Sequence, residues 1–163
     1  AGCASATFSL ESASPEILKA MNKRISVEGF IFQAKLFHRA GIPVNTSLVF
    51  GYPQETAESI QKTFDVCIEC EIYPSSGFLL PQPGSGMHDY ALEHGYITDQ
   101  EDYLLRIGDR QDLYLNMSKL SDEELVSLVQ QGAQRCNEEL QLGLDNGSLI
   151  KTRHALRLER EKV

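Results

Sequence analysis

Residues 44–51 show the clearest pattern of hydrophobic and polar positions in the chain. Apolar or branched side chains alternate with small or polar ones: Val44, Thr46, Leu48 and Phe50 against Asn45, Ser47, Val49 and Gly51. This period of two predicts a strand with one apolar face and one small, polar face. Pro53 ends the pattern, and residues 57–70 then show the three- and four-residue spacing of an amphipathic helix. A strand that leads directly into a helix indicates an α/β protein.

The same order of strand and helix is predicted before and after this stretch. Alternation predicts parallel strands joined by right-handed crossovers, with helices over the apolar faces and the polar faces lining an interior. Caps support the helix boundaries, since Ser14-Pro15 suits a helix start and Gly41 a helix end. The further predicted elements are a strand at 5–11, a short helix from Pro15, a helix at 27–40, a strand at 77–80, a loop at 81–86 and a helix at 87–94.

After residue 97 only helices are predicted. Thr98-x-x-Glu101 and Ser121-x-x-Glu124 both have the spacing of a capping box. The second precedes a long amphipathic pattern to about Leu142, with Gly143 as its C-terminal cap. Residues 102–120 carry few signals, and we expect irregular structure packed over the edge of the sheet.

Two parts are therefore expected. Residues 1–97 form half of a (β/α) barrel with parallel strands, and residues 98–163 form a C-terminal helical extension. Three parallel strands leave both sheet edges open and the polar face uncovered. Since the chain also lacks an initiator Met, we expect a fragment that requires the upstream half of the barrel.

Composition excludes some classes of function. No apolar run approaches the roughly 20 residues of a membrane span, and no basic and apolar leader precedes the first strand, so we expect a cytoplasmic protein without a membrane partner. The net charge of −8 argues against a general nucleic-acid binder. Lys and Arg between Lys151 and Lys162 are interleaved with Leu and Glu, and we interpret them as a solvated helix face.

The cysteines allow more than one interpretation. Cys67 and Cys70 have C-x-x-C spacing, which occurs in redox pairs and in half of a zinc site. No second pair exists, and the pair falls late in the predicted helix, whereas a redox pair begins one. We expect core thiols, with no metal site in this chain.

Four stretches, taken in order, resemble a known family. They are Ser9-Leu10-Glu11-Ser12-Ala13-Ser14, Leu18 to Lys23, Phe50-Gly51-Tyr52-Pro53-Gln54-Glu55-Thr56, and Leu80 to Gly86. In this order, they are similar to four motifs of radical S-adenosylmethionine (SAM) enzymes. The first two are the Gly-Leu-Glu-Ser-Gly-Ser segment at the end of the fourth strand and the Leu-x-x-Met-x-Lys that follows it. The last two are the Phe-Gly-Phe-Pro-Gly-Glu-Thr turn after the fifth strand and the loop after the sixth strand. The branch includes cobalamin-dependent members and methylthiotransferases. The resemblance covers residues 5–97, with departures at Ser9, Ala13, Gln54 and Gly86.

The resemblance implies a SAM site across the carboxyl ends of the strands. It assigns Glu11 and Ser12 to the ribose hydroxyls or the amino-acid end, Ser47, Val49 and Gly51 to the inner wall beside the adenine, and Glu55 to the following helix or turn. Other roles remain open: Glu11 in a rim ion pair, Ser47 and Val49 in packing, and Glu55 at a helix dipole. The geometric expectation is that Glu11, Ser47 and Gly51 converge on one hollow.

The family's Cys-x-x-x-Cys-x-x-Cys motif, which holds a [4Fe–4S] cluster, is absent and belongs upstream. The resemblance thus implies a fragment of an enzyme that cleaves SAM reductively to a 5′-deoxyadenosyl radical and acts on a small-molecule substrate. The cluster ligands would lie outside this chain, and cobalamin use would depend on a separate domain. Catalytic residues are not identified. The alternatives are a non-catalytic half-barrel that binds a ligand or partner, and a phosphate-binding β/α-barrel fragment.

Overall fold

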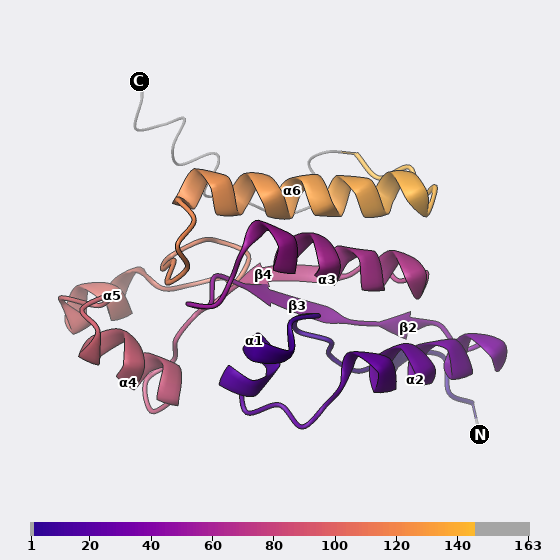
Figure 1. Ribbon diagram of the computed structural model, residues 1–163, viewed down its shortest axis with the longest axis horizontal. Coiled ribbons are helices and arrows are strands. Elements are labelled where there is room, and N and C mark those ends of the chain that lie inside the picture. Colours follow the sequence, from indigo (N-terminus) through magenta and orange to yellow (C-terminus); the bar gives the residue numbers. More distant parts are fainter. Residues whose placement is uncertain (1, 146–163) are drawn as a thin grey trace.

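The structure, a computed structural model, describes residues 2–145, and the basic stretch from Lys151 to Lys162 lies outside them. Strands and helices are interspersed up to residue 93, and helices follow (Figure 1). The elements are β1 (Ala6–Thr7), α1 (Pro15–Ala20), α2 (Val27–Arg39), β2 (Val44–Asn45), β3 (Ser47–Phe50), α3 (Ala57–Glu69), β4 (Ser75–Phe78), α4 (Gly86–Glu93), α5 (Gln100–Arg106) and α6 (Asp122–Glu139).

All strand pairs in the described part of the chain are parallel, as predicted. β1 pairs with β2, and β3 pairs with β4. An isolated parallel bridge between Glu11 and Leu48 joins the two pairs. β2 and β3 follow each other in line (Figure 1), so they form the middle of the sheet between β1 and β4. The fold is mixed α/β with small parallel sheets and no closed barrel within residues 2–145.

The predicted strand boundaries need three corrections. The strand expected at 5–11 is regular only at Ala6–Thr7, and the strand expected at 44–51 divides at Thr46. The Thr46 hydroxyl accepts a hydrogen bond from the Leu10 N–H at 2.8 Å, while its carbonyl accepts one from Ser75 N–H at 2.9 Å. A side chain thus replaces a backbone acceptor, and the middle strand changes its partner there. The third strand begins two residues earlier than predicted, because pairing with β3 recruits two serines that lack an apolar pattern.

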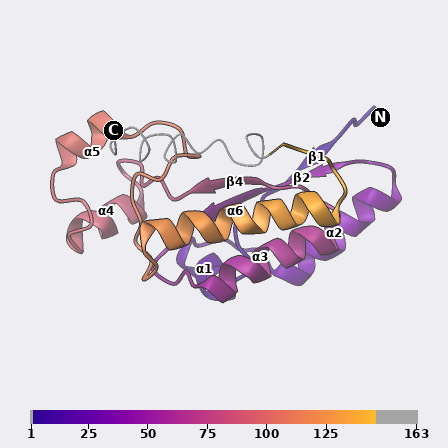
Figure 2. The ribbon, with the colours of Figure 1, turned by 90° about the horizontal axis from the view of Figure 1, so that it is seen from above.

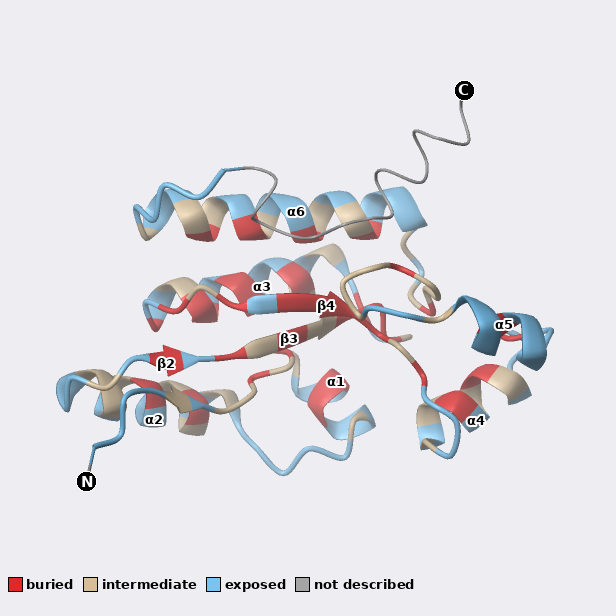
Figure 3. Cartoon of the chain, turned by 180° about the vertical axis from the view of Figure 1, so that it is seen from behind, coloured by how far each residue is buried: buried red, intermediate tan, exposed pale blue. Residues whose placement is uncertain are grey.

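Helices α1, α2, α3 and α6 cover one side of the strands (Figure 2). Their buried residues face the sheet, and their exposed residues face away from it (Figure 3). The rings of Phe50 and Phe64 stack at 5.4 Å between β3 and α3. α3 and α6 approach closely because Gly132 has no side chain: an added Cβ would lie 2.1 Å from the Phe64 ring. The main core contains, among others, Leu10, Phe30, Leu48, Phe50, Phe64, Phe78, Leu125 and Val129.

The helix caps confirm most predicted boundaries. Ser14 caps α1, and Ser121 forms a capping box with Glu124 at the start of α6. The capping box expected at Thr98 is wrong, because Asp99 accepts the Asp102 N–H at 2.9 Å and begins α5.

Two further boundaries in the C-terminal part differ from the prediction. α5 extends to Arg106, into the stretch expected to be irregular. α6 ends at Glu139 rather than near Leu142. The Asn137 side chain holds the turn that follows, because it donates to the Leu144 carbonyl and accepts from the Leu144 N–H, both at 2.9 Å.

Cys67, Cys70 and Cys136 are buried free thiols, and Cys3 is exposed. The prediction of core thiols is confirmed for Cys67 and Cys70. Burial raises the pKa of the Cys70 thiol to about 11 and that of Cys136 to about 12. These thiols therefore stay protonated at neutral pH, which suits packing rather than redox chemistry. No helix within residues 2–145 has the length and apolar character needed to cross a bilayer.

Candidate functional site

Two adjoining cavities lie at the carboxyl ends of β3 and β4. The larger, here the outer cavity, has a volume of about 740 Å³ and lies between the end of α1, the turn at 52–54, the loop at 79–82 and α4. The smaller, the inner cavity, has about 390 Å³ and lies over the polar side of the strands. Ligands of α/β proteins bind at this end of parallel strands, so the position favours a ligand site.

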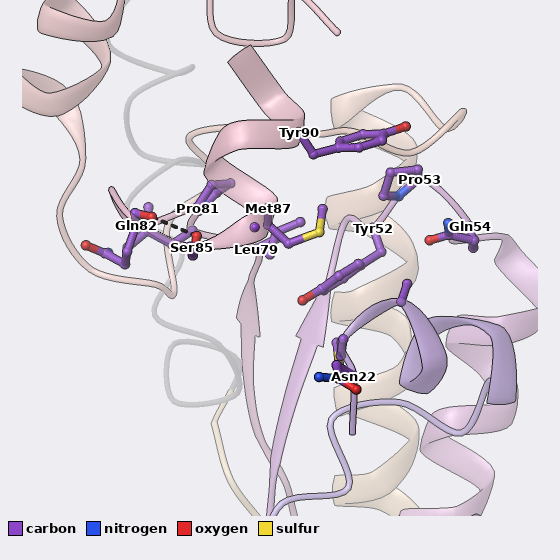
Figure 4. Close-up of a pocket in the computed structure, with 14 residues that line it drawn as sticks. Asn22, Tyr52, Pro53, Gln54, Leu79, Pro81, Gln82, Ser85, Met87 and Tyr90 are labelled. Atoms are coloured by element: carbon purple, nitrogen blue, oxygen red, sulfur yellow. Dashed lines mark hydrogen bonds between the residues drawn. The ribbon is translucent and has the colours of Figure 1, made fainter. Parts of the chain in front are cut away.

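Tyr52 lines both cavities. Its ring lies between the end of α1 and Met87 of α4 (Figure 4). Burial, with a smaller contribution from the Glu11 charge, raises the pKa of the Tyr52 phenol to about 12. The phenol is therefore protonated at neutral pH and can donate a hydrogen bond to a ligand.

Both apolar and polar side chains line the outer cavity. Tyr90 lies opposite Pro53, and Met87 points toward Tyr52 (Figure 4). Ser85 caps α4 and donates from its hydroxyl to the Gln82 carbonyl at 2.7 Å, which holds the loop at the cavity wall. Apolar walls with a few fixed polar groups are typical of small-molecule sites.

Glu11 stands at the rim of the inner cavity. Its φ of +62° is in the left-handed region. Its backbone still forms two hydrogen bonds with β3: the Glu11 N–H donates to the Ser47 carbonyl at 2.9 Å, and the Glu11 carbonyl accepts from the Val49 N–H at 3.0 Å. Lys23 forms an ion pair with the carboxylate at 3.0 Å. The rim ion pair considered from the sequence therefore exists, and it leaves carboxylate lone pairs for a ligand. Val49 lines the same cavity.

Ser12 and Ser47 do not line either cavity. Ser12 is 1% exposed, and its hydroxyl accepts the Ser14 N–H at 3.1 Å. The Ser47 hydroxyl lies 2.9 Å from that of Ser9. In this structure both hydroxyls hold neighbouring chain segments together.

Gly51 and Glu55 also lie outside the cavity linings. Gly51 has a φ of +103°, and a Cβ there would lie 3.6 Å from Leu125 of α6. Glu55 is 2% exposed and accepts hydrogen bonds from the Ser59 hydroxyl and the Gly51 backbone. Burial raises the pKa of the Glu55 carboxyl to about 7. Glu55 thus contacts both the turn and the first turn of α3. Of the three residues expected to converge on one hollow, only Glu11 lines the cavities.

Several cavity residues were missed by sequence reasoning. Tyr52 belongs to the turn that carries the resemblance and could have been found there. Lys23 was named only as the last residue of a stretch that carries the resemblance. Arg110 lies in the stretch without clear signals, and its place in the inner cavity depends on a contact with β4 far away in the chain.

The described residues do not fit a [4Fe–4S] cluster. No group of three His, Cys, Asp or Glu side chains within residues 2–145 could hold a metal ion. Cys3 is exposed, and the other thiols are in the core. A cluster needs several thiolates directed at one point, which this arrangement does not provide.

The profile of the radical SAM superfamily matches residues 1–67. This match and the relatives below support a relationship of the chain to the radical SAM superfamily. An uncharacterised methyltransferase of Pyrococcus horikoshii is 30% identical over 97 residues, which are 59% of this chain and 21% of that protein. A tRNA-2-methylthio-N(6)-dimethylallyladenosine synthase of Corynebacterium diphtheriae is 28% identical over 147 residues, 85% of this chain and 28% of the relative.

A bacteriochlorophyllide d C-12(1)-methyltransferase of Chlorobaculum tepidum is also similar, with 27% identity over 131 residues, 77% of this chain and 27% of the relative. The chain thus spans between a fifth and a third of the length of these relatives. The superfamily implies SAM and a [4Fe–4S] cluster. The matched segment contains Glu11, Lys23, Val49 and Tyr52, so it includes much of the inner cavity.

Proposed function

We propose that this chain is the C-terminal half of the core domain of a radical SAM enzyme and that it binds SAM at the inner cavity. The observation that carries the proposal is the cavity at the strand ends, in which Glu11, Val49 and Tyr52 of the superfamily-matched segment lie together. The fold class that we propose for the whole protein is a partial (β/α) barrel. Its upstream half would pair at β1 and close the interior.

The residues of the inner cavity suit an adenosine group. The Glu11 carboxylate, held by Lys23 at 3.0 Å, accepts hydrogen bonds from ribose hydroxyls. The Tyr52 phenol donates one. Val49 and Leu79 offer apolar contacts to the faces of the adenine ring.

For the whole protein we propose reductive cleavage of SAM, in which one added electron breaks the bond from sulfur to C5′ and yields methionine and a 5′-deoxyadenosyl radical. Because residues 2–145 provide no cluster site, we assign this chain the binding and orientation of SAM and not the supply of the electron. The names of the relatives support the branch of methyltransferases and methylthiotransferases. The proposal also includes cobalamin as a further cofactor, a small-molecule substrate and a cytoplasmic location.

The test is SAM binding by the complete encoded protein, purified without oxygen and measured by titration calorimetry. Glu11→Gln keeps the shape of the side chain and removes its charge, so we expect SAM affinity to fall at least about tenfold, the usual effect of losing a hydrogen bond to a charged group. Glu16→Gln, at the exposed start of α1, is the matched control. Equal affinity of wild type and Glu11→Gln would contradict the assignment.

A second candidate is a half-barrel that binds SAM or another ligand without catalysis. It is favoured by the four residues that the resemblance assigns to SAM but that line neither cavity: Ser12, Ser47, Gly51 and Glu55. The two separate when the complete protein is reduced with dithionite in the presence of SAM and the products are analysed by mass spectrometry. Formation of 5′-deoxyadenosine supports the enzyme, whereas SAM binding without this product supports the binding module.

A further inference from the structure

Arg110 lines the inner cavity, and its guanidinium group lies over the polar side of the sheet. One terminal nitrogen lies 3.4 Å from the Leu48 carbonyl of β3. The other donates to the Ser75 carbonyl at 3.2 Å and to the Ser75 hydroxyl at 2.8 Å. The side chain therefore spans β3 and β4 and is held by three acceptors that carry no charge.

The backbone of β4 is shaped to receive this side chain. The Phe78 N–H donates to the Arg110 carbonyl at 2.7 Å, which attaches residue 110 to the edge of the strand. A Cβ at Gly77 would lie 2.9 Å from the Arg110 guanidinium and 3.0 Å from its carbonyl. Any larger residue at position 77 would displace the arginine, so Gly77 and Arg110 form one built unit.

The hydrogen bonds of the Arg110 guanidinium within the described residues are to uncharged partners. Within residues 2–145, no carboxylate forms an ion pair with it, whereas Lys23 is already paired with Glu11. The cavity thus carries one cation in excess in a chain of net charge −8. The three contacts above use both Nη2–H groups and one Nη1–H group, so the Nε–H and one Nη1–H remain, and each can donate a single charge-assisted hydrogen bond to an oxyanion.

We propose that Arg110 binds an oxyanion, a carboxylate or phosphate group, of the substrate, next to the SAM site. The inference rests on the proposed function, because the Glu11 and Tyr52 side of the same cavity is assigned to SAM. Arg110 comes from residues beyond the superfamily match at 1–67, the part of the chain in which relatives with one shared chemistry can differ in substrate. SAM has a carboxylate too, so the source of the oxyanion must be tested.

The direct measurement is nuclear magnetic resonance of the complete encoded protein with ¹⁵N-labelled arginine, in which each Nε–H group gives a separate signal. Arg110→Lys identifies the Arg110 signal by its loss. The probes are inorganic phosphate, acetate and neutral acetamide, at constant ionic strength with chloride. We expect phosphate or acetate to shift the Arg110 signal saturably, at concentrations about tenfold below those that affect exposed Arg39. Equal responses of the two arginines would overturn the proposal.

A second arm identifies the source of the oxyanion. SAM and decarboxylated SAM are titrated into wild type, Arg110→Gln and Arg110→Lys, with thermal unfolding to confirm that each variant is folded. We expect the same SAM affinity in all three proteins, and we expect phosphate to raise the thermal unfolding midpoint of the wild type but not that of the Gln variant. A tenfold loss of SAM affinity that is absent for decarboxylated SAM would assign Arg110 to SAM itself and overturn its role toward the substrate. If wild type does not bind SAM but the oxyanion response persists, the proposed function fails and the oxyanion site remains.

Discussion

The two faces of the sheet are built from neighbouring residues of the same strands and differ in almost every physical property. On the helix side, Leu10, Leu48 and Phe50 are 0% exposed and belong to one core. On the other side, Ser47 and Val49 are half-buried, and hydroxyls, an ion pair and a guanidinium hold the surface together. The helix side stabilises the fold by apolar burial. The cavity side contributes less to stability and is free to provide groups that bind a ligand.

The largest effect is expected from a substitution on the helix side. Phe50→Ala removes a ring that stacks on Phe64 and should reduce the free energy of unfolding by about 3–5 kcal/mol. Val49→Ala, one residue earlier on the cavity side, should cost about 1 kcal/mol or less, since its side chain is only half-buried. Urea unfolding of both variants measures the difference. Similar losses would mean that the two faces are equally part of the core.

Glu55 is the exception on the helix side, and it makes the comparison depend on pH. The carboxyl has a pKa of about 7 in the folded chain and 4.5 as its ordinary value. The folded state therefore holds a proton that the unfolded state releases between pH 4.5 and 7. Its contribution to stability is greatest below pH 4.5, decreases as the pH rises to 7 and is constant above, a change of about 2–4 kcal/mol.

Glu55→Gln should remove this decrease, because Gln does not titrate. Urea unfolding at intervals from pH 4.5 to 8 gives the measurement, and Glu58→Gln at an exposed position of α3 serves as the control. If the Gln variant keeps the wild-type slope, another group is responsible.

The contact between α3 and α6 tests how tightly the helix side is packed. Gly132→Ala would place a methyl group 2.1 Å from the Phe64 ring, and the two helices must separate. We expect a loss of about 1–3 kcal/mol from overpacking, reduced by the better helix propensity of Ala. Gly86→Ala, where nothing lies within 4 Å of the new Cβ, should be close to neutral. Thermal unfolding distinguishes them, and an unchanged midpoint for Gly132→Ala would show that the seam is looser than described.

The smallest effect is expected at the rim of the cavity. Lys23→Met breaks the ion pair with Glu11, whose side chain is 13% exposed while that of Lys23 is 43% exposed. Partly exposed pairs contribute up to about 1 kcal/mol, so stability should change little. Lys35→Met, which breaks an exposed pair with Glu69, is a matched control. A loss above about 2 kcal/mol at Lys23 would place the rim within the stabilising core, contrary to the division of the two faces.

The same division explains which features were predictable. Local patterns reported local structure: alternation at 44–51 identified the buried face of β3, and Ser14 and Ser121 marked helix starts. Features that depend on contacts between distant segments were missed. Thr46 divides a strand because its side chain accepts a hydrogen bond from Leu10. Leu10 lies far from Thr46 in the sequence, so the local pattern around Thr46 could not predict this bond. Thr98 and Asp99 are both residue types that cap helices, and the local sequence does not decide between them.

The candidate site was predicted in part for the same reason. Glu11 and Val49 were named and line the inner cavity, while Ser12, Ser47, Gly51 and Glu55 serve the strands and the turn around it. A motif identifies the neighbourhood of a ligand, but the side chains that face it depend on φ angles and on segments elsewhere in the chain. Arg110 is the clearest case, because it reaches the cavity from a stretch without any pattern.

Tyr52 has a consequence beyond its place between the two cavities. A molecule in either cavity contacts the Tyr52 ring, so the first molecule to bind sets the ring position that the second molecule contacts. Thermodynamic linkage requires this influence to be mutual: if occupancy of one compartment tightens binding in the other by some factor, the reverse factor is identical. One aromatic side chain thus gives two binding events a means of cooperating without movement of the sheet.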